Sequence, residues 1–120
     1  MSDNSAIEKI VEDYFLGMYE GDVERLRRIF HAECRLYGER KGQKSDFAVE
    51  GFFRYVADSP VPKDTGEPYE MKIVSINRTG PVAVVHVEDL YQGGHFTDYL
   101  TAMETGDGWR IVNKAFYSED

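Results

Sequence analysis

Apolar residues recur at spacings of three and four along the first thirty positions, which is the pattern of helices with one buried face. Ser5 followed by Glu8 predicts a capping box at the start of a first helix. Gly21 predicts the end of this helix, and Asp22 predicts the N-cap of a second, shorter one. The apolar positions of the two predicted helices are Ile7, Ile10, Val11, Tyr14, Phe15, Met18, Val23, Leu26, Ile29 and Phe30.

The pattern changes after the second helix. A period of two around positions 34–38 predicts a short strand and a turn. From about 45 to 57 the helical spacing returns and predicts a third helix. Its buried positions are Val49, Phe52, Phe53 and Val56. Positions 58–68 contain three prolines and a glycine, which predicts a loop, and loops of this length often border binding sites.

The last fifty residues predict four strands joined by turns that contain glycine. The predicted strands are 69–77, 82–92, 95–105 and 109–117. Helices followed by an antiparallel meander indicate an α+β fold, with three N-terminal helices packed on one face of a curved antiparallel sheet. Neither side of the central loop carries a self-sufficient core, so we expect residues 1–120 to form a single domain.

The pairing of two of these strands suggests a site. Gly93 and Gly94 predict a two-residue hairpin turn, and in that register Asp89 lies directly opposite Asp98. Because side chains alternate along a strand, each face of the hairpin can be assigned. The more apolar face, which we expect to meet the helices, carries Val85, Val87, Asp89, Tyr91, Phe96, Asp98, Leu100 and Ala102.

Two carboxyl groups on an apolar, helix-covered surface suggest a functional role. Burial disfavours the charge of a carboxylate, and a second carboxylate nearby disfavours it further, so the pKa rises. We therefore expect at least one of Asp89 and Asp98 to be protonated, or to hold a ligand group, near neutral pH. The alternative is that both lie at the end of the hairpin, with their carboxylates splayed into water at little cost.

Composition limits the partners. The formal net charge of −8 argues against nucleic acid and against anionic membrane surfaces, because both require a basic surface. Cys34 is the only cysteine, which excludes an intrachain disulfide and suits a reducing compartment. The N-terminus has no signal-peptide pattern, and no apolar run approaches the roughly 20 residues of a membrane helix. We expect a cytoplasmic protein.

Five segments, taken in order, resemble a known superfamily. They are Ile10-Val-Glu-Asp-Tyr14, Glu20-Gly-Asp22, Ile29-Phe-His31, Phe96-Thr-Asp98-Tyr-Leu100 and Gly108-Trp-Arg-Ile-Val-Asn-Lys114. Together they resemble the nuclear transport factor 2-like superfamily, in particular its lumazine-binding branch, which is related to the SnoaL-like polyketide cyclases and ketosteroid isomerases. The resemblance implies a cone-shaped fold with a pocket between helices and concave sheet, and a homodimer through the outer sheet face.

The resemblance also implies catalytic roles. Isomerases of this superfamily form an oxyanion hole from a tyrosine on the first helix and a protonated aspartate on a late strand, and Tyr14 and Asp98 look like the matching positions. Their general base is an aspartate at the end of the first strand, where this chain has Leu36-Tyr-Gly-Glu39. The proton acceptor would then be Glu39, His31 or Asp89. An alternative role for His31 is to cap the second helix.

Further positions complete the predicted pocket. A simple register of the last strand points Asn113 inward and Lys114 outward, although a bulge at Gly108 would exchange them. The residues expected to contact a ligand are Met18, Tyr37, Phe53, Val87, Phe96, Leu100 and Asn113.

A metal site is the weaker interpretation of the outer sheet face. His86, Glu88 and His95 share that face, but they lack a tight ligand spacing, and a polar dimer interface is the alternative. We expect neither a metal nor a cofactor.

Two functions remain open at this point. The first is a pocket that binds a small carbonyl-bearing molecule, with acid–base catalysis of an isomerase, dehydratase or cyclase type. The second is a non-catalytic dimeric binding or scaffold protein, in which aromatic side chains fill the cone and leave no cavity above roughly 300 Å³.

Overall fold

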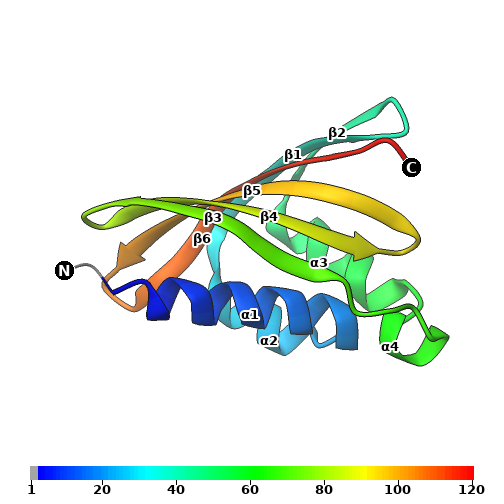
Figure 1. The fold of residues 1–120 in the computed structure, drawn as a ribbon, viewed down its shortest axis with the longest axis horizontal. Helices are drawn as coiled ribbons and strands as arrows, with labels where there is room; N and C mark the ends of the chain where they lie inside the picture. Colours follow the sequence, from blue (N-terminus) through cyan, green and yellow to red (C-terminus); the bar gives the residue numbers. More distant parts are fainter. Residues whose placement is uncertain (1–2) are drawn as a thin grey trace.

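The computed structural model of the protein describes residues 3–120 and places the helices on one face of a strongly curved sheet (Figure 1). Met1 and Ser2, on which the expectation of no signal peptide partly rests, lie outside this range. The helices are α1 (Ser5–Glu20), α2 (Val23–Ile29), α3 (Val49–Asp58) and α4 (Pro62–Thr65). The strands are β1 (Phe30–Arg40), β2 (Gln43–Ala48), β3 (Met71–Thr79), β4 (Val82–Tyr91), β5 (Gly94–Thr105) and β6 (Gly108–Ser118).

The predicted α+β class is confirmed, and the sheet is mixed. Its six strands follow the order β2-β1-β6-β5-β4-β3, and every neighbouring pair is antiparallel except β1 with β6, which is parallel. The expectation of a purely antiparallel sheet was therefore wrong at this pair. After β1, the chain forms β2, crosses through α3 and α4, and completes the β3–β4–β5 meander. It then returns along β6 beside β1 in the same direction.

The three main helices were predicted, but two of their starts were not. The predicted capping box at Ser5 was wrong: α1 has Asn4 as its N-cap without a side-chain hydrogen bond, and the Ser5 backbone N–H instead donates to Asp3 Oδ1 at 2.9 Å. The third helix begins at Val49 rather than near 45, because Ser45–Ala48 pair with β1 as part of β2. The predicted loop at 58–68 contains the short helix α4.

The β4–β5 turn lies one residue earlier than predicted, and this moves every cross-strand partner by two residues. Gln92 and Gly93 occupy the turn with φ values of 52° and 78°, the left-handed pair that a two-residue hairpin of this kind requires. Gly94 is instead paired with Tyr91 in the ladder. A Cβ at Gly94 would lie 2.8 Å from Arg40 Nη2, so this glycine is required by packing and not by the turn.

The shift changes the partner of each aspartate but not the face on which it lies. Asp89 pairs with Phe96, and Asp98 pairs with Val87, so the two carboxyl groups are diagonal neighbours rather than directly opposite. A displacement of two residues preserves the alternation of side chains, which is why both still point toward the helices. Both are buried, which excludes the alternative that they are splayed into water.

The core fills the space between the helices and the concave face of the sheet. Tyr14 and Met18 of α1, Phe52 of α3 and Leu100 of β5 are among its buried members. Within residues 3–120, none of the helices combines the length and the apolar character that a membrane crossing requires.

Candidate functional site: a cavity between helix α3 and the concave sheet

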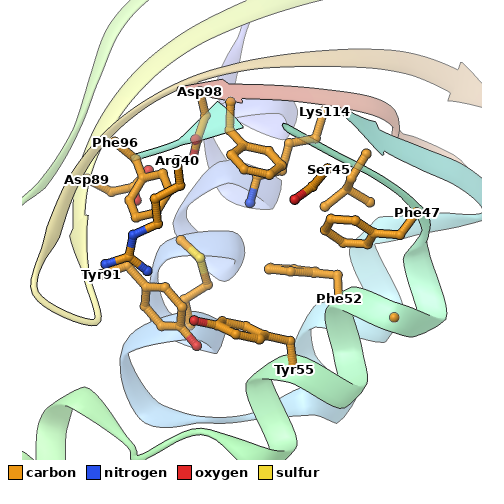
Figure 2. A pocket seen from close by; sticks show the side chains of 14 residues that line it. Arg40, Ser45, Phe47, Phe52, Tyr55, Asp89, Tyr91, Phe96, Asp98 and Lys114 are labelled. Carbon is orange, nitrogen blue, oxygen red and sulfur yellow. The ribbon is translucent and has the colours of Figure 1, made fainter. Parts of the chain in front are cut away.

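A cavity of about 350 Å³ opens between α1, α3 and the concave face of the sheet (Figure 2). Its volume lies at the lower end of the range for small-molecule sites, roughly 300–1,000 Å³. Six aromatic side chains line it: Phe47, Phe52, Tyr55, Tyr91, Phe96 and Phe116. Polar groups reach it from the sheet side, and they include Asp89, Asp98 and Lys114. The cavity therefore suits a molecule with a flat apolar body and one polar end.

Asp98 of β5 is fixed by a tyrosine behind it. The phenol of Tyr14 on α1 donates a hydrogen bond of 2.6 Å to Asp98 Oδ2. Both side chains are almost fully buried, with exposed fractions of 0% and 1%. Burial, followed by the nearby charge of Asp98, raises the pKa of Tyr14 well above its usual value, so the phenol keeps its proton and acts as a donor. Tyr14 itself does not line the cavity.

Asp89 of β4 is the second buried carboxyl group. Burial is the largest cause that raises its pKa well above the ordinary value. The charge of Asp98 and hydrogen bonding with its carboxyl group raise this pKa further, and Lys114 lowers it in part. Burial and the neighbouring carboxyl group therefore both favour the protonated form of Asp89.

Each carboxyl group presents one oxygen that the chain leaves without a partner. Asp89 Oδ2 and Asp98 Oδ1 are buried and, apart from a proton shared between the two carboxyl groups, have no hydrogen-bond partner among the residues that the structure describes. An unpaired buried polar atom costs about 1–3 kcal/mol. Such atoms are rare in native proteins, and here two of them border one cavity.

Lys114 of β6 is the functional candidate that the sequence analysis placed on the wrong face. A bulge lies between the pairs Thr101–Asn113 and Ala102–Ile111, so Val112 is the extra residue. The bulge exchanges the faces, so Lys114 points inward and Asn113 lies on the outer face, where its amide donates to Arg35 O. The sequence contains a signal of this bulge. Ile111 and Phe116 both face inward, yet an odd interval separates them, and a regular strand would place them on opposite faces.

The ammonium group of Lys114 is surrounded by rings. Its Nζ lies 4.3 Å from the ring centre of Phe52, 5.0 Å from that of Tyr14 and 5.4 Å from that of Phe116. The side chain is only 6% exposed. Within residues 3–120, Nζ forms no hydrogen bond and no ion pair. Figure 2 shows the amine directed into the cavity.

A second cation, Arg40 at the end of β1, lies at the side of the cavity near the β4–β5 turn. Its guanidinium donates to Gln92 O at 3.0 Å and to Asp120 O at 3.2 Å, and it stacks over Phe96 at 5.1 Å. These contacts hold the turn and the C-terminus against β1. Arg40 is thus an anchored wall of the cavity, and the sequence analysis did not identify it.

The structure brings only part of the predicted ligand set together. Met18 and Phe96 line the cavity. Phe53, Val87 and Leu100 are buried in the core beside it without lining it. Phe52, the neighbour of Phe53, faces the cavity instead.

Three predicted residues lie elsewhere. Tyr37 is 46% exposed on the outer face, because Leu36 takes the inward position on β1. Asn113 is on the outer face for the reason given above. His31 belongs to β1 rather than to a turn, is exposed, and accepts a hydrogen bond from the Glu33 backbone N–H. These placements contradict the predicted inward positions, and Glu39 is likewise not among the lining residues.

The thiol of Cys34 and the imidazole of His86 have no part in the cavity. Cys34 is buried, and burial raises the pKa of its thiol to about 12. His86 stacks on Tyr99 on the outer face, with ring centres 4.7 Å apart. Among residues 3–120, no three His, Cys, Asp or Glu side chains are grouped to hold a metal ion.

The fold is shared by several solved structures. A protein of unknown function from Silicibacter pomeroyi, described as NTF-2 like, is 29% identical with a TM-score of 0.86 over 95% of this chain and 93% of its own. Proteins described as NTF2-like from Methylobacillus flagellatus and Shewanella baltica are each 19% identical. Their TM-scores are 0.85 and 0.84, they cover 100% and 96% of this chain, and the matches span 96% and 92% of their own lengths. No curated protein matches this chain.

The architecture and these likenesses define an NTF2-like protein. The sequence matches the family described as "Putative lumazine-binding" over residues 2–117, and the chain belongs to that family. A family so described indicates a ligand-binding domain.

Proposed function

We propose that the cavity binds a small carbonyl-bearing molecule and that the pair Asp89 and Asp98 exchanges protons with it. The observation that carries this proposal is the pair itself: two buried carboxyl groups on neighbouring strands, each with an unpartnered oxygen at one cavity. A pair of titratable groups whose environments separate their protonation states is a typical acid–base arrangement.

The geometry favours different roles from those that the resemblance implies. Asp89, with its raised pKa, is the neutral acid that donates a hydrogen bond to the carbonyl oxygen. Asp98 accepts a hydrogen bond from Tyr14 and is the group that removes a proton from the carbon beside the carbonyl. Tyr14 positions Asp98 and does not touch the ligand. The earlier assignment of Asp98 as the donor and Asp89 as the acceptor is therefore reversed.

The proposed step balances within the pair. The C–H bond next to the carbonyl breaks, its proton passes to Asp98, and its electron pair forms the carbon–carbon double bond of an enol. The carbonyl oxygen takes the proton of Asp89. In the reverse direction the enol oxygen returns its proton to Asp89 while Asp98 gives a proton to carbon. Delivery to another carbon of the conjugated enol gives an isomer, and delivery to the original carbon of a proton that Asp98 has exchanged with water gives exchange with solvent.

The family description is compatible with this chemistry. Lumazine is a flat ring system that carries carbonyl groups, and the cavity combines aromatic walls with polar groups on one side. The solved relatives are described as proteins of unknown function or only as NTF2-like, so they favour neither a reaction nor simple binding.

The alternative, a non-catalytic dimeric scaffold, is supported by one feature of the surface. The outer face of the sheet exposes large apolar side chains whose exposed fractions are between 40% and 49%: Val82, Val84, Tyr99, Met103 and Tyr117. Such a patch favours burial against a second copy of the chain. The cavity of about 350 Å³ argues against a cone that is filled entirely by aromatic rings.

Native mass spectrometry of freshly purified protein tests binding, because a co-purifying molecule appears as an added mass. Proton exchange is tested with phenylacetone in heavy water, with proton NMR to follow loss of the signal next to the carbonyl. We expect the wild type to accelerate exchange and the variants Asp98→Asn and Asp89→Asn to lose about 100-fold of that acceleration. The matched control Asp107→Asn changes an exposed turn residue and should behave as wild type. Equal rates for wild type and both site variants would refute proton exchange.

A further inference from the structure

The amine of Lys114 is buried and is surrounded by rings; it acts on the pKa of Asp89 from a distance but forms no direct ion pair within residues 3–120. Three rings contact it at 4.3–5.4 Å, and within residues 3–120 no carboxylate is paired with it. Contacts of this kind are weak compared with the cost of removing an ammonium ion from water. The rings therefore offset only part of the cost, and an anion in the cavity would offset more.

The position of Lys114 in the sheet defines where such an anion lies. Lys114 pairs with Leu100, and Asp98 pairs with Phe116, so Lys114 and Asp98 are diagonal neighbours on one face. Diagonal positions on adjacent strands are roughly 7–8 Å apart. An anion on the Lys114 amine and an oxygen that meets the aspartate pair therefore fit within one small ligand.

The other residues that line the cavity limit the shape and the charge of the ligand that carries this anion. Phe47, Phe52 and Tyr55 border the end of the cavity that is remote from the aspartates (Figure 2). The two carboxyl groups of Asp89 and Asp98 disfavour a second anionic group on their side of the cavity. A flat apolar group with a single short anionic end fits both constraints.

We propose that the cavity selects small oxo acids, in which a carboxylate pairs with Lys114 and a neighbouring oxo oxygen meets the Asp89–Asp98 pair. The flat apolar part of such a molecule lies between the rings of α3 and β2. This inference rests on the proposed function, because it names the class of carbonyl compound. It assigns Lys114 as the residue that distinguishes an acid from its neutral counterpart.

Isothermal titration calorimetry with phenylglyoxylate and its methyl ester tests the proposal. The two probes share the ring and the oxo group and differ in the negative charge. We expect the wild type to bind the acid about tenfold or more tightly than the ester, because a charge-assisted hydrogen bond is stronger than a neutral one. In Lys114→Met this preference should disappear through loss of acid binding, while ester binding changes little.

Two further variants complete the design. Lys114→Arg keeps the charge and should retain a preference for the acid. Lys9→Met removes an exposed lysine of α1 that pairs with Asp13, and it controls for the change in net charge. If Lys114→Met does not fold, Lys114→Gln, which is also neutral but keeps a polar end, takes its place in the comparison of acid and ester.

The outcomes separate the two proposals. Equal binding of acid and ester by the wild type would overturn the role of Lys114 while leaving the carbonyl pocket intact. Absence of binding by either probe would overturn both. An acid preference that persists in Lys114→Met would place the anion elsewhere, most directly on Arg40, and would also overturn the inference.

Discussion

The phenol of Tyr14 and the carboxyl group of Asp98 are joined by a hydrogen bond of 2.6 Å, although the two residues are 84 positions apart in the chain. The bond connects α1 to β5 through the core, where both groups are shielded from water. Tyr14 therefore determines which oxygen of Asp98 remains available to the cavity. A contact of this kind contributes to the stability of the fold and also orients the carboxyl group on which the proposed chemistry depends.

We expect Tyr14→Phe to lower the free energy of unfolding by about 1–3 kcal/mol, because it leaves Asp98 Oδ2 buried without its donor. Urea denaturation followed by circular dichroism measures the change. Tyr99→Phe is the matched control, since Tyr99 is 49% exposed and its hydroxyl group forms no hydrogen bond within residues 3–120. The double variant with Asp98→Asn should cost less than the sum of the single changes, and strict additivity would contradict a direct coupling.

The raised pKa of Asp89 makes stability depend on pH. A carboxyl group whose pKa is higher in the folded state than in the unfolded state stabilises the fold in its protonated form. This contribution is present below the ordinary value of 3.8 and is lost as the pH rises through the folded-state pKa. We expect Asp89→Asn to be more stable than the wild type by about 1–3 kcal/mol at pH 8 and to lose this advantage toward pH 4. Urea denaturation at several pH values measures both curves. A constant difference across that range would contradict a raised pKa.

Much of the site follows from local sequence patterns. The helical spacing of apolar residues identifies the inward face of α1 and with it Tyr14 and Met18. The alternation along β4 and β5 identifies Asp89 and Asp98 as inward residues. This result remains correct although the predicted cross-strand partners were wrong, because a pairing error of two residues leaves each side chain on the same face. The periodicity of apolar residues therefore predicts the sheet face on which a side chain lies more reliably than it predicts the residue with which it pairs.

Strand β2 and the bulge in β6 could not be predicted from periodicity, because both depend on contacts between strands. Strand β2 carries mostly polar, exposed residues, and it becomes a strand only through its pairing with β1. The bulge at Val112 exchanges the faces of β6 after Ile111 and turns Lys114 inward. A bulge is selected by the packing of neighbouring strands, so the sequence allows it without requiring it. For this reason the sequence analysis assigned Asn113 to the pocket in place of Lys114.

Gly38 of β1 allows the ring of Phe116 to lie against the strand. A Cβ at position 38 would come within 2.4 Å of three atoms of that ring. We expect Gly38→Ala to displace Phe116 toward the cavity and to lower the free energy of unfolding by about 1–3 kcal/mol. Thermal unfolding by differential scanning calorimetry measures the effect. Gly106→Ala is the matched control because a Cβ there meets nothing within 4 Å, and an equal loss in both variants would contradict the packing role of Gly38.

The apolar patch on the outer sheet face predicts a homodimer in solution. Tyr99 lies within this patch, stacked on His86 and 49% exposed, so it would be buried by a second copy. We expect wild type to have the mass of a dimer in size-exclusion chromatography with light scattering. Tyr99→Glu should shift the mass to that of a monomer, because a buried unpaired carboxylate opposes association by several kcal/mol. Tyr69→Glu makes the same change at a residue of similar exposure that packs on Tyr19 of α1, on the helix side, and should leave the dimer intact. If wild type is monomeric at every concentration, or if Tyr99→Glu remains dimeric, this face is not the interface. The exposed rings would then have to be explained by contact with a different protein.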